Sequence, residues 1–358
     1  MSRISTIALT LLRWVVGATF LFSGIAKCVD PVGSAIYVDK YLATYALDAF
    51  MPLSQGIAIA LMVVETLLGV WLIFGAFRRI ASLVSLVIIS LFTVVTLLSA
   101  TVLPIGECGC FGDIVELTPW QTFLKNILLL ALCIALWHWG GEKRAISLKD
   151  GVVTLVGIAL PLAVSLYALR HLPFVDSMPY KVGTSLFDEV SKEREMEQQS
   201  VQNVLIFKNL TTGESVEFDA ADTSCWEDAN LEFVDAVTRE IPMDATYSEF
   251  RLYDAEGEDY TLDVLGRKGR VALLCVNDAQ HINDKHLRGI TSLLKQYPSE
   301  GVVLLTAVDR AQVAELIDED ITTLTIDAMT LRSVIRSDIG VVVLHDGVVE
   351  FKSDIRDI

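Results

Sequence analysis

The chain has 358 residues, enough for two or three domains, and 53% of them are hydrophobic, with a mean hydropathy of +0.50. That composition excludes an ordinary soluble protein of this length and indicates membrane-spanning segments. Residues 1–170 carry 11 Lys+Arg against 9 Asp+Glu, a net of +2, whereas residues 171–358 carry 17 against 36, a net of −19. The acidic second half excludes nucleic acid as a partner, because nucleic-acid phosphates would be repelled.

Five apolar runs in the first half are each about as long as the roughly 20 residues that cross a bilayer core. They cover residues 7–26, 56–77, 80–103, 119–139 and 152–169. The first run spans the full bilayer width and lacks a small-x-small cleavage site, so we expect it to be retained rather than removed as a signal peptide.

Basic residues predict the orientation of these runs. Arg3, Arg78-Arg79 and Lys143-Arg144 fall at the N-terminus, the second connection and the fourth, and the third connection has no Lys or Arg. By the positive-inside rule the N-terminus is cytoplasmic. The third connection and the acidic half then lie outside.

Ionisable residues within the spans are expensive in hydrocarbon and usually face the bundle interior. Arg13 and Glu65 predict an ion pair between the first two spans, and the alternative is that Glu65 handles protons beside a cofactor pocket. Lys125 lies about 9 Å below the outer face, and Lys27 ends the first span. Positive charge near a thiol favours the thiolate. Snorkelling to the interface is the simpler interpretation of both lysines, and we favour it for Lys27.

The third connection contains the only closely spaced cysteine pair, Cys108 and Cys110, separated by Gly109. A disulfide across one residue closes a very small, easily reduced ring, which glycine makes less strained. The pair therefore favours redox exchange, with a structural loop as the main alternative and metal binding as a weaker one. Cys28 is either a third thiol of this site or a small apolar residue, and Cys133 is expected to be inert packing.

Several short motifs in residues 5–140 resemble known membrane families. Those that resemble DoxX-like proteins are Phe22-Ser23-Gly24, Lys27, Asp30-Pro31 and Tyr41-Leu42. Those that resemble MauE, the methylamine-utilisation branch, are Glu65 with Leu68-Gly69, Cys108-Gly109-Cys110-Phe111-Gly112-Asp113, and Thr122-Phe123-Leu124-Lys125-Asn126. The resemblance implies a four-helix membrane bundle grouped with thiol-oxidising systems, in which MauE is thought to help disulfide formation in a partner enzyme. Cys28 is not part of this pattern.

Residues 173–246 predict a connecting region. Residues 204–208 and 215–218 flank the turn Thr212-Gly213 and indicate a β-hairpin. Trp226 is expected to anchor a helix through Val237. Cys225 stands in an acidic loop and is interpreted as a single cysteine without a special role, and the alternative is an exposed thiol that pairs with another.

From residue 249 onward, strand and helix patterns alternate. Strands are predicted at 271–276, 302–308, 341–345 and 348–352, and helices at 282–297, 311–317 and 331–335. This order resembles a thioredoxin-like fold. Where that family has its reactive cysteines and its cis-proline, this chain has Asn277-Asp278 and Asp338-Ile339-Gly340, Cys275 lies within a buried strand, and the closing helix is missing. His281 and His286 lie on different helix faces, so no metal site is expected.

The sequence thus predicts an α-helical membrane bundle of five transmembrane helices over residues 1–172, a DoxX/MauE-like four-helix core plus one. A soluble α/β thioredoxin-like domain over 247–358, which has lost thiol chemistry, is expected to recruit a partner. The leading hypothesis is a bacterial inner-membrane protein that exchanges a disulfide with a periplasmic partner. The residues involved would be Cys108 and Cys110, supported by Cys28, Lys27, Glu65, Lys125 and Arg13.

Other functions remain open at this point, and so does whether the protein is an enzyme. A quinone between the helices is a candidate electron acceptor. The competing hypothesis is a non-catalytic membrane-anchored scaffold whose outer domain binds a partner. A transporter is less favoured, because five spans without repeats are unlike known transporters.

Overall fold

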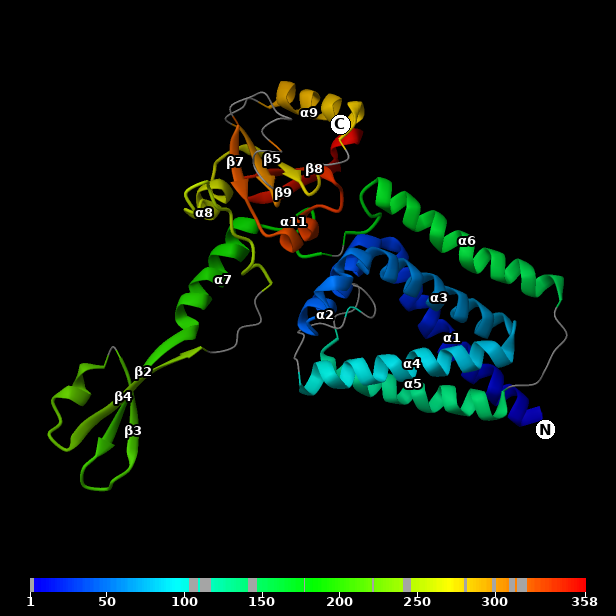
Figure 1. The fold of residues 1–358 in the computed structure, drawn as a ribbon, viewed down its shortest axis with the longest axis horizontal. Coiled ribbons are helices and arrows are strands. Elements are labelled where there is room, and N and C mark those ends of the chain that lie inside the picture. The colour runs from blue at the N-terminus through cyan, green and yellow to red at the C-terminus, as the bar shows by residue number, and fades with distance from the viewer. Residues whose placement is uncertain are drawn as a thin grey trace.

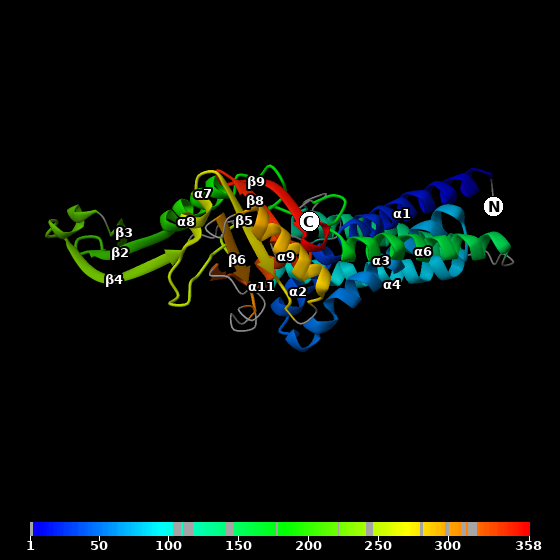
Figure 2. The ribbon, with the colours of Figure 1, turned by 90° about the horizontal axis from the view of Figure 1, so that it is seen from above.

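The computed structural model describes residues 3–102, 109, 117–140, 147–176, 178–220, 222–240, 246–279, 282–297, 301–308, 313 and 321–358. Figure 1 shows three parts: a helical bundle, an α/β domain at one end of it, and a slender β arm that projects from the domain. Figure 2, turned by 90°, shows the three parts in a row along the long axis.

Five helices form the bundle and confirm the five predicted spans. They are α1 (Arg3–Val29), α3 (Ser54–Phe74), α4 (Arg78–Thr101), α5 (Pro119–Trp139) and α6 (Leu148–Arg170). All five are long and apolar enough to cross a membrane. Their outer faces expose large apolar side chains, and their inner faces bury small polar ones such as Ser85, Thr96 and Asn126. Such an interior is typical of helix packing in lipid, where small and polar residues hold the interfaces.

A sixth helix, α2 (Pro31–Thr44), was not predicted from the sequence. The side chain of Asp30 caps its N-terminus by accepting a hydrogen bond from the amide of Gly33, and Pro31 occupies the first helical position. A 3₁₀ turn, η1 (Asp48–Leu53), leads on to α3. Helix α2 lies at the end of the bundle that faces the C-terminal domain (Figure 1).

The C-terminal domain is built on a five-stranded sheet in the order β7-β6-β5-β8-β9. Its strands are β5 (Arg270–Val276), β6 (Val302–Thr306), β7 (Thr322–Thr325), β8 (Ile339–His345) and β9 (Val348–Asp354). Strands β5, β6 and β7 are parallel, and β8 and β9 continue the sheet antiparallel. The predicted α/β thioredoxin-like arrangement is confirmed, and β7 is an edge strand that the sequence did not indicate.

Helices cover both faces of this sheet, which explains why its central strands are continuously apolar. On one face lie α7 (Leu186–Ser200), α8 (Thr261–Leu265) and α11 (Ala328–Val334), and on the other lies α9 (Asp284–Gln296). Tyr180, Leu186 and Val190 belong to the first core, so the segment after α6 takes part in the domain. The helix predicted at 311–317 falls almost entirely outside the described residues.

The arm is a three-stranded antiparallel sheet of β2 (Val201–Asn209), β3 (Ser215–Asp219) and β4 (Leu231–Glu240). The predicted hairpin is confirmed, but the predicted helix through Val237 is wrong, because that segment is β4, paired along β2. Phe233 of β4 and Trp226 both pack on Phe207, and this contact is what favours the strand. Cys225 is 1% exposed, so the alternative of an exposed thiol is wrong.

Candidate functional site

A buried ion pair joins α1 to α3 inside the bundle. The Nζ atom of Lys27 lies 2.8 Å from Oε2 of Glu65 and also donates to Oγ of Ser23 at 2.8 Å. Lys27 is 8% exposed and Glu65 is 1% exposed. The snorkelling interpretation favoured for Lys27 is therefore wrong. Its ammonium group turns into the bundle because a carboxylate stands at its level on the antiparallel helix.

The predicted pair between Arg13 and Glu65 is also wrong. Arg13 lies 14 residues before Lys27 on α1, about 21 Å along the helix axis, and so at the other end of the bundle. There its guanidinium donates to Oγ1 of Thr10 and lies beside Arg78, near the turn at Gly75. Helix spacing alone excludes contact with a carboxylate that pairs with Lys27.

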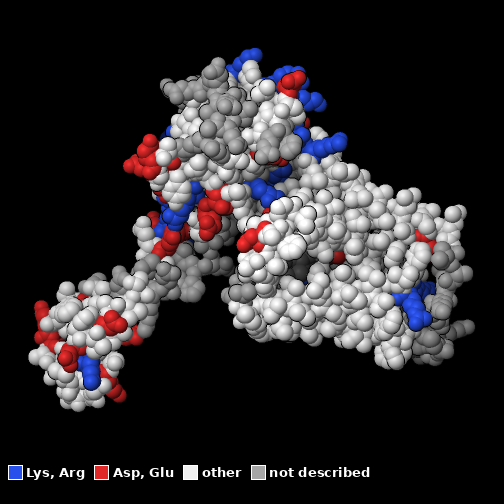
Figure 3. Space-filling model, viewed as in Figure 1, with Lys and Arg blue, Asp and Glu red and all other residues white. Residues whose placement is uncertain are grey.

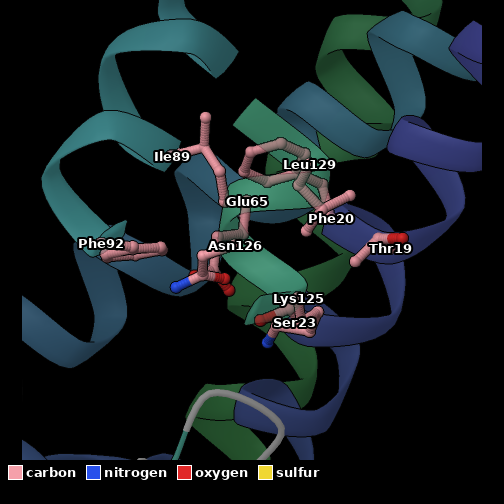
Figure 4. A pocket seen from close by; sticks show the side chains of 9 residues that line it. All are labelled: Thr19, Phe20, Ser23, Glu65, Ile89, Phe92, Lys125, Asn126 and Leu129. Atoms are coloured by element: carbon pink, nitrogen blue, oxygen red, sulfur yellow. The ribbon is translucent and has the colours of Figure 1, made fainter. Parts of the chain in front are cut away.

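Side chains from four helices enclose a small cavity beside Glu65 (Figure 4). Its volume is about 30 Å³, and its lining is Thr19, Phe20, Ser23, Glu65, Ile89, Phe92, Lys125, Asn126 and Leu129. The second carboxylate oxygen of Glu65, Oε1, has no hydrogen-bond partner among the residues that the structure describes. The predicted site residues Lys27, Glu65 and Lys125 are thus brought together, and Arg13 is not.

The cavity tests the quinone hypothesis. A volume of about 30 Å³ has room for about one water molecule and not for the ring of a quinone. The residues around Glu65 therefore do not fit a quinone as they are arranged.

Cys108 and Cys110 lie outside the described residues, but Gly109 between them is described. Its φ of +61° is in the left-handed region that favours glycine. A Cβ atom at this position would collide with the ring of Tyr37, so the glycine backbone lies directly against α2. Tyr37, which the sequence analysis did not single out, is therefore the described neighbour of the cysteine loop.

The other cysteines among the described residues are buried free thiols. Cys28 is 5% exposed at the end of α1, and Cys133 is fully buried in α5, as expected for packing. Cys275 lies in β5, where burial raises the pKa of its thiol to about 12. A thiol that stays protonated is a poor nucleophile, in agreement with the predicted loss of thiol chemistry from this domain. Among the described residues, no three His, Cys, Asp or Glu side chains are grouped so that they could hold a metal ion.

Charged side chains attach the C-terminal domain to the bundle. Arg336, just before β8, donates from Nε to Asp30 at 3.0 Å and from Nη2 to Asp176 at 2.9 Å. Arg332 of α11 donates to Asp39 of α2 at 2.9 Å. These contacts were not predicted from the sequence. The one local signal for them is the Asp30-Pro31 pair, a helix start that would have indicated α2.

Comparison with known proteins agrees with this architecture for the bundle. Residues 5–139 match the family model of the methylamine utilisation protein MauE. This segment contains α1 to α5 and the cysteine loop, so the N-terminal part of the chain is MauE-like, as its motifs predicted.

The chain is also similar to Protein TlpB of Flavobacterium psychrophilum, with 26% identity over 163 residues. The match covers 44% of this chain and 43% of that protein, so the chain spans less than half the length of this relative. No solved structure matches the chain significantly.

Proposed function

We propose that this membrane protein takes part in thiol–disulfide exchange with a periplasmic partner through Cys108 and Cys110. The observation that supports this most is the placement of Gly109. It adopts a left-handed backbone, packs on Tyr37 and thereby ties the cysteine loop to α2. Because α2 follows directly on the end of α1 that carries Lys27 and Cys28, Gly109 lies at the same end of the bundle as the Lys27–Glu65 pair.

The proposed step is a balanced exchange. Two thiols of the partner are oxidised to a disulfide, and the Cys108–Cys110 disulfide is reduced to two thiols. Two electrons and two protons therefore pass from the partner to the loop. The reacting species is a thiolate, so the step depends on groups that can hold a released proton. Glu65, with one carboxylate oxygen lacking a described partner, is our candidate for that role.

The C-terminal domain has a different part in this proposal. Cys275 is its only cysteine in the 247–358 range and is fully buried, so the domain supplies no thiol to the exchange. Asn277, just after β5, donates a hydrogen bond to the carbonyl of Ser337. The neighbouring residue Arg336 binds Asp30, so this end of the sheet lies next to the bundle. The domain would hold the partner near the loop rather than react with it.

The scaffold hypothesis has one observation in its favour. Trp226 and Phe233 on the projecting arm stack at 5.5 Å and remain 59% and 44% exposed. Exposed aromatic side chains are enriched in protein interfaces, so the arm is a candidate partner contact under either hypothesis.

The two functions differ in the thiol state of the loop. We expect Cys108 and Cys110 in native membranes to shift between alkylatable and protected forms when reductant and oxidant are alternated. A Cys108→Ser/Cys110→Ser variant should lose this shift and slow disulfide formation in co-purifying proteins. Cys133→Ser is the matched control, because that thiol is buried in α5 and should change neither readout. Thiols that never change state, with a double variant that behaves like the wild type, would establish the scaffold instead.

A further inference from the structure

A cavity of about 220 Å³ lies at the junction between the last span and the C-terminal domain. We call it the junction cavity. Its apolar side is formed by Leu172, Pro173 and Phe174 after α6 together with Val182, and its polar side by Asp176, Arg336 and Lys352. The volume is several times the roughly 30 Å³ of one water molecule. The cavity shares no lining residue with the Glu65 cavity.

Two buried cationic side chains line the junction cavity, and each has more N–H groups than it has described acceptors. The side chains of Arg336 and Lys352 are 1% and 4% exposed. Arg336 donates to Asp30, Asp176 and the carbonyl of Ser333, which uses three of the five N–H groups of a guanidinium. Lys352 donates to Asp176 and the carbonyl of Tyr180, which uses two of its three. Within the described chain, three N–H donors on buried cations therefore have no acceptor.

Asp176 bridges the two cations from the segment that follows α6. Its Oδ1 accepts from Arg336 and its Oδ2 from Lys352, at 2.9 and 2.5 Å. Burial disfavours the charged form, but the charges of Arg336 and Lys352 outweigh it and lower the pKa of Asp176. The two cations therefore stabilise a negative charge at the position of the Asp176 carboxylate. With Asp30 as the second carboxylate the cluster is neutral, so an added anion fits only where it takes the place of Asp176.

The rim of the cavity follows directly on the last span, α6, and this position predicts that it lies at the depth of lipid headgroups. Phe174 and Val182 are 64% and 55% exposed. The ring of Phe174 stacks at 4.6 Å on Tyr167, in the last turn of α6. Aromatic residues at the end of a span mark the boundary between bilayer and water. A ligand that enters here meets an apolar rim first and cations behind it, which suits an amphiphile with a small anionic head.

We propose that the junction cavity binds the phosphate group of an anionic phospholipid, held by Arg336 and Lys352, and that Asp176 substitutes for this phosphate when the site is empty. Guanidinium and ammonium groups are the side chains that recognise phosphate best. Such a lipid would link the C-terminal domain to the membrane surface. The inference is independent of the thiol chemistry proposed above.

The protonation of Lys352 gives the site a pH dependence. Burial and the neighbouring Arg336 lower the pKa of Lys352 to about 8, against the opposing effects of Asp176 and the Cys275 thiol. The lysine is then charged at pH 7 and largely neutral at pH 9. Phosphate binding should weaken over that interval.

The test uses the full chain in nanodiscs of phosphatidylcholine with increasing phosphatidylglycerol, and native mass spectrometry to count retained lipid. Lys352→Met should weaken retention about tenfold, or about 1.4 kcal/mol, since it removes one charge-assisted hydrogen bond to the phosphate. Lys352→Arg should restore it. Asp176→Asn should strengthen retention about tenfold by removing the competing carboxylate. Lys181→Met, a neighbouring exposed lysine, is the matched control and should change nothing.

The direction in which Asp176→Asn changes lipid retention decides whether the proposal holds. Weaker retention in folded Asp176→Asn protein, or an equal loss in Lys352→Met and Lys181→Met, would overturn the proposal, because both would indicate a nonspecific surface charge effect. Inorganic phosphate forms the second arm. If phosphate alone raises the unfolding temperature of the wild type in neutral lipid but phosphatidylglycerol is not retained, the ligand is a soluble phosphate and the lipid assignment is wrong.

Discussion

Glu65 is almost completely buried, and it accepts a hydrogen bond from Lys27, 38 positions earlier. A charge pair inside a bilayer-spanning bundle is costly to desolvate, so its stability contribution is small compared with the penalty for losing one partner. The pair therefore fixes how far α1 is shifted along its axis relative to α3. Ser23 extends the constraint, because the ammonium of Lys27 bonds to it as well.

Removing one member of this pair should be more harmful than removing both. We expect Lys27→Met to destabilise the detergent-solubilised protein by about 3–5 kcal/mol, since Glu65 is left as an unpaired buried charge. Lys27→Met with Glu65→Leu should recover most of that loss. Equilibrium unfolding in denaturant, followed by tryptophan fluorescence, measures both.

Arg13 is the control for this double-mutant cycle of Lys27 and Glu65. Arg13→Met and Glu65→Leu should be additive, because Arg13 lies against Gly75, ten residues or about 15 Å beyond Glu65 in the direction of α3. A coupling of more than about 1 kcal/mol between Arg13 and Glu65 would contradict the structure.

At the scale of the elements, α1 and α3 form the closest helix pair of the bundle. A Cβ atom on Gly69 of α3 would lie 2.5 Å from the backbone nitrogen of Leu21 on α1, and one on Gly24 would collide with Thr66. Small residues on both helices let the backbones touch, which is how helices associate tightly in lipid. This close approach is also what brings Lys27 and Glu65 within bonding distance.

Gly69→Leu should therefore separate the two helices. Because the obstructing atoms belong to the backbone of α1, we expect a loss of about 3 kcal/mol or more, at the upper end of overpacking effects. Gly56→Leu on the same helix is the control, since nothing lies within 4 Å of a Cβ there. Thermal unfolding in detergent should show a large drop for the first variant and a near-wild-type value for the second.

Over the whole molecule, charge is unevenly distributed. Figure 3 shows few charged residues on the bundle. It shows many on the C-terminal domain and on the arm. The contact between the two parts is ionic: Arg332 with Asp39, and Arg336 with Asp30 and Asp176. The domain is thus held in one orientation over α2, the helix against which Gly109 packs.

A charge swap tests this attachment. Asp39→Arg should loosen the domain, because it places a cation opposite Arg332 in a nearly buried position. Arg332→Asp alone should do the same by pairing two carboxylates. The double swap should restore the contact, as measured by protection of α2 from hydrogen exchange and by resistance of residues 171–176 to limited proteolysis. Equal protection in all four proteins would show that the ion pair does not hold the domain.

The sequence by itself determined the elements whose signals are local. Long apolar runs and flanking basic residues predicted all five spans, and alternating strand and helix patterns predicted the α/β domain, because length and periodicity are properties of contiguous residues. It also identified Glu65, Lys27 and Lys125 as the unusual charges of the membrane half.

Only the tertiary structure decided which of those charges meet. From the sequence alone, Arg13 and Lys27 are both plausible partners of Glu65. The antiparallel packing of α1 and α3 brings Lys27, and not Arg13, to the level of Glu65. The strand β4 was decided in the same way, by pairing with β2 rather than by its own propensity. The docking of Arg336 on Asp30, 306 positions apart, carries no local signal at all. Long-range contacts depend on how whole elements pack, and a single sequence does not state that packing.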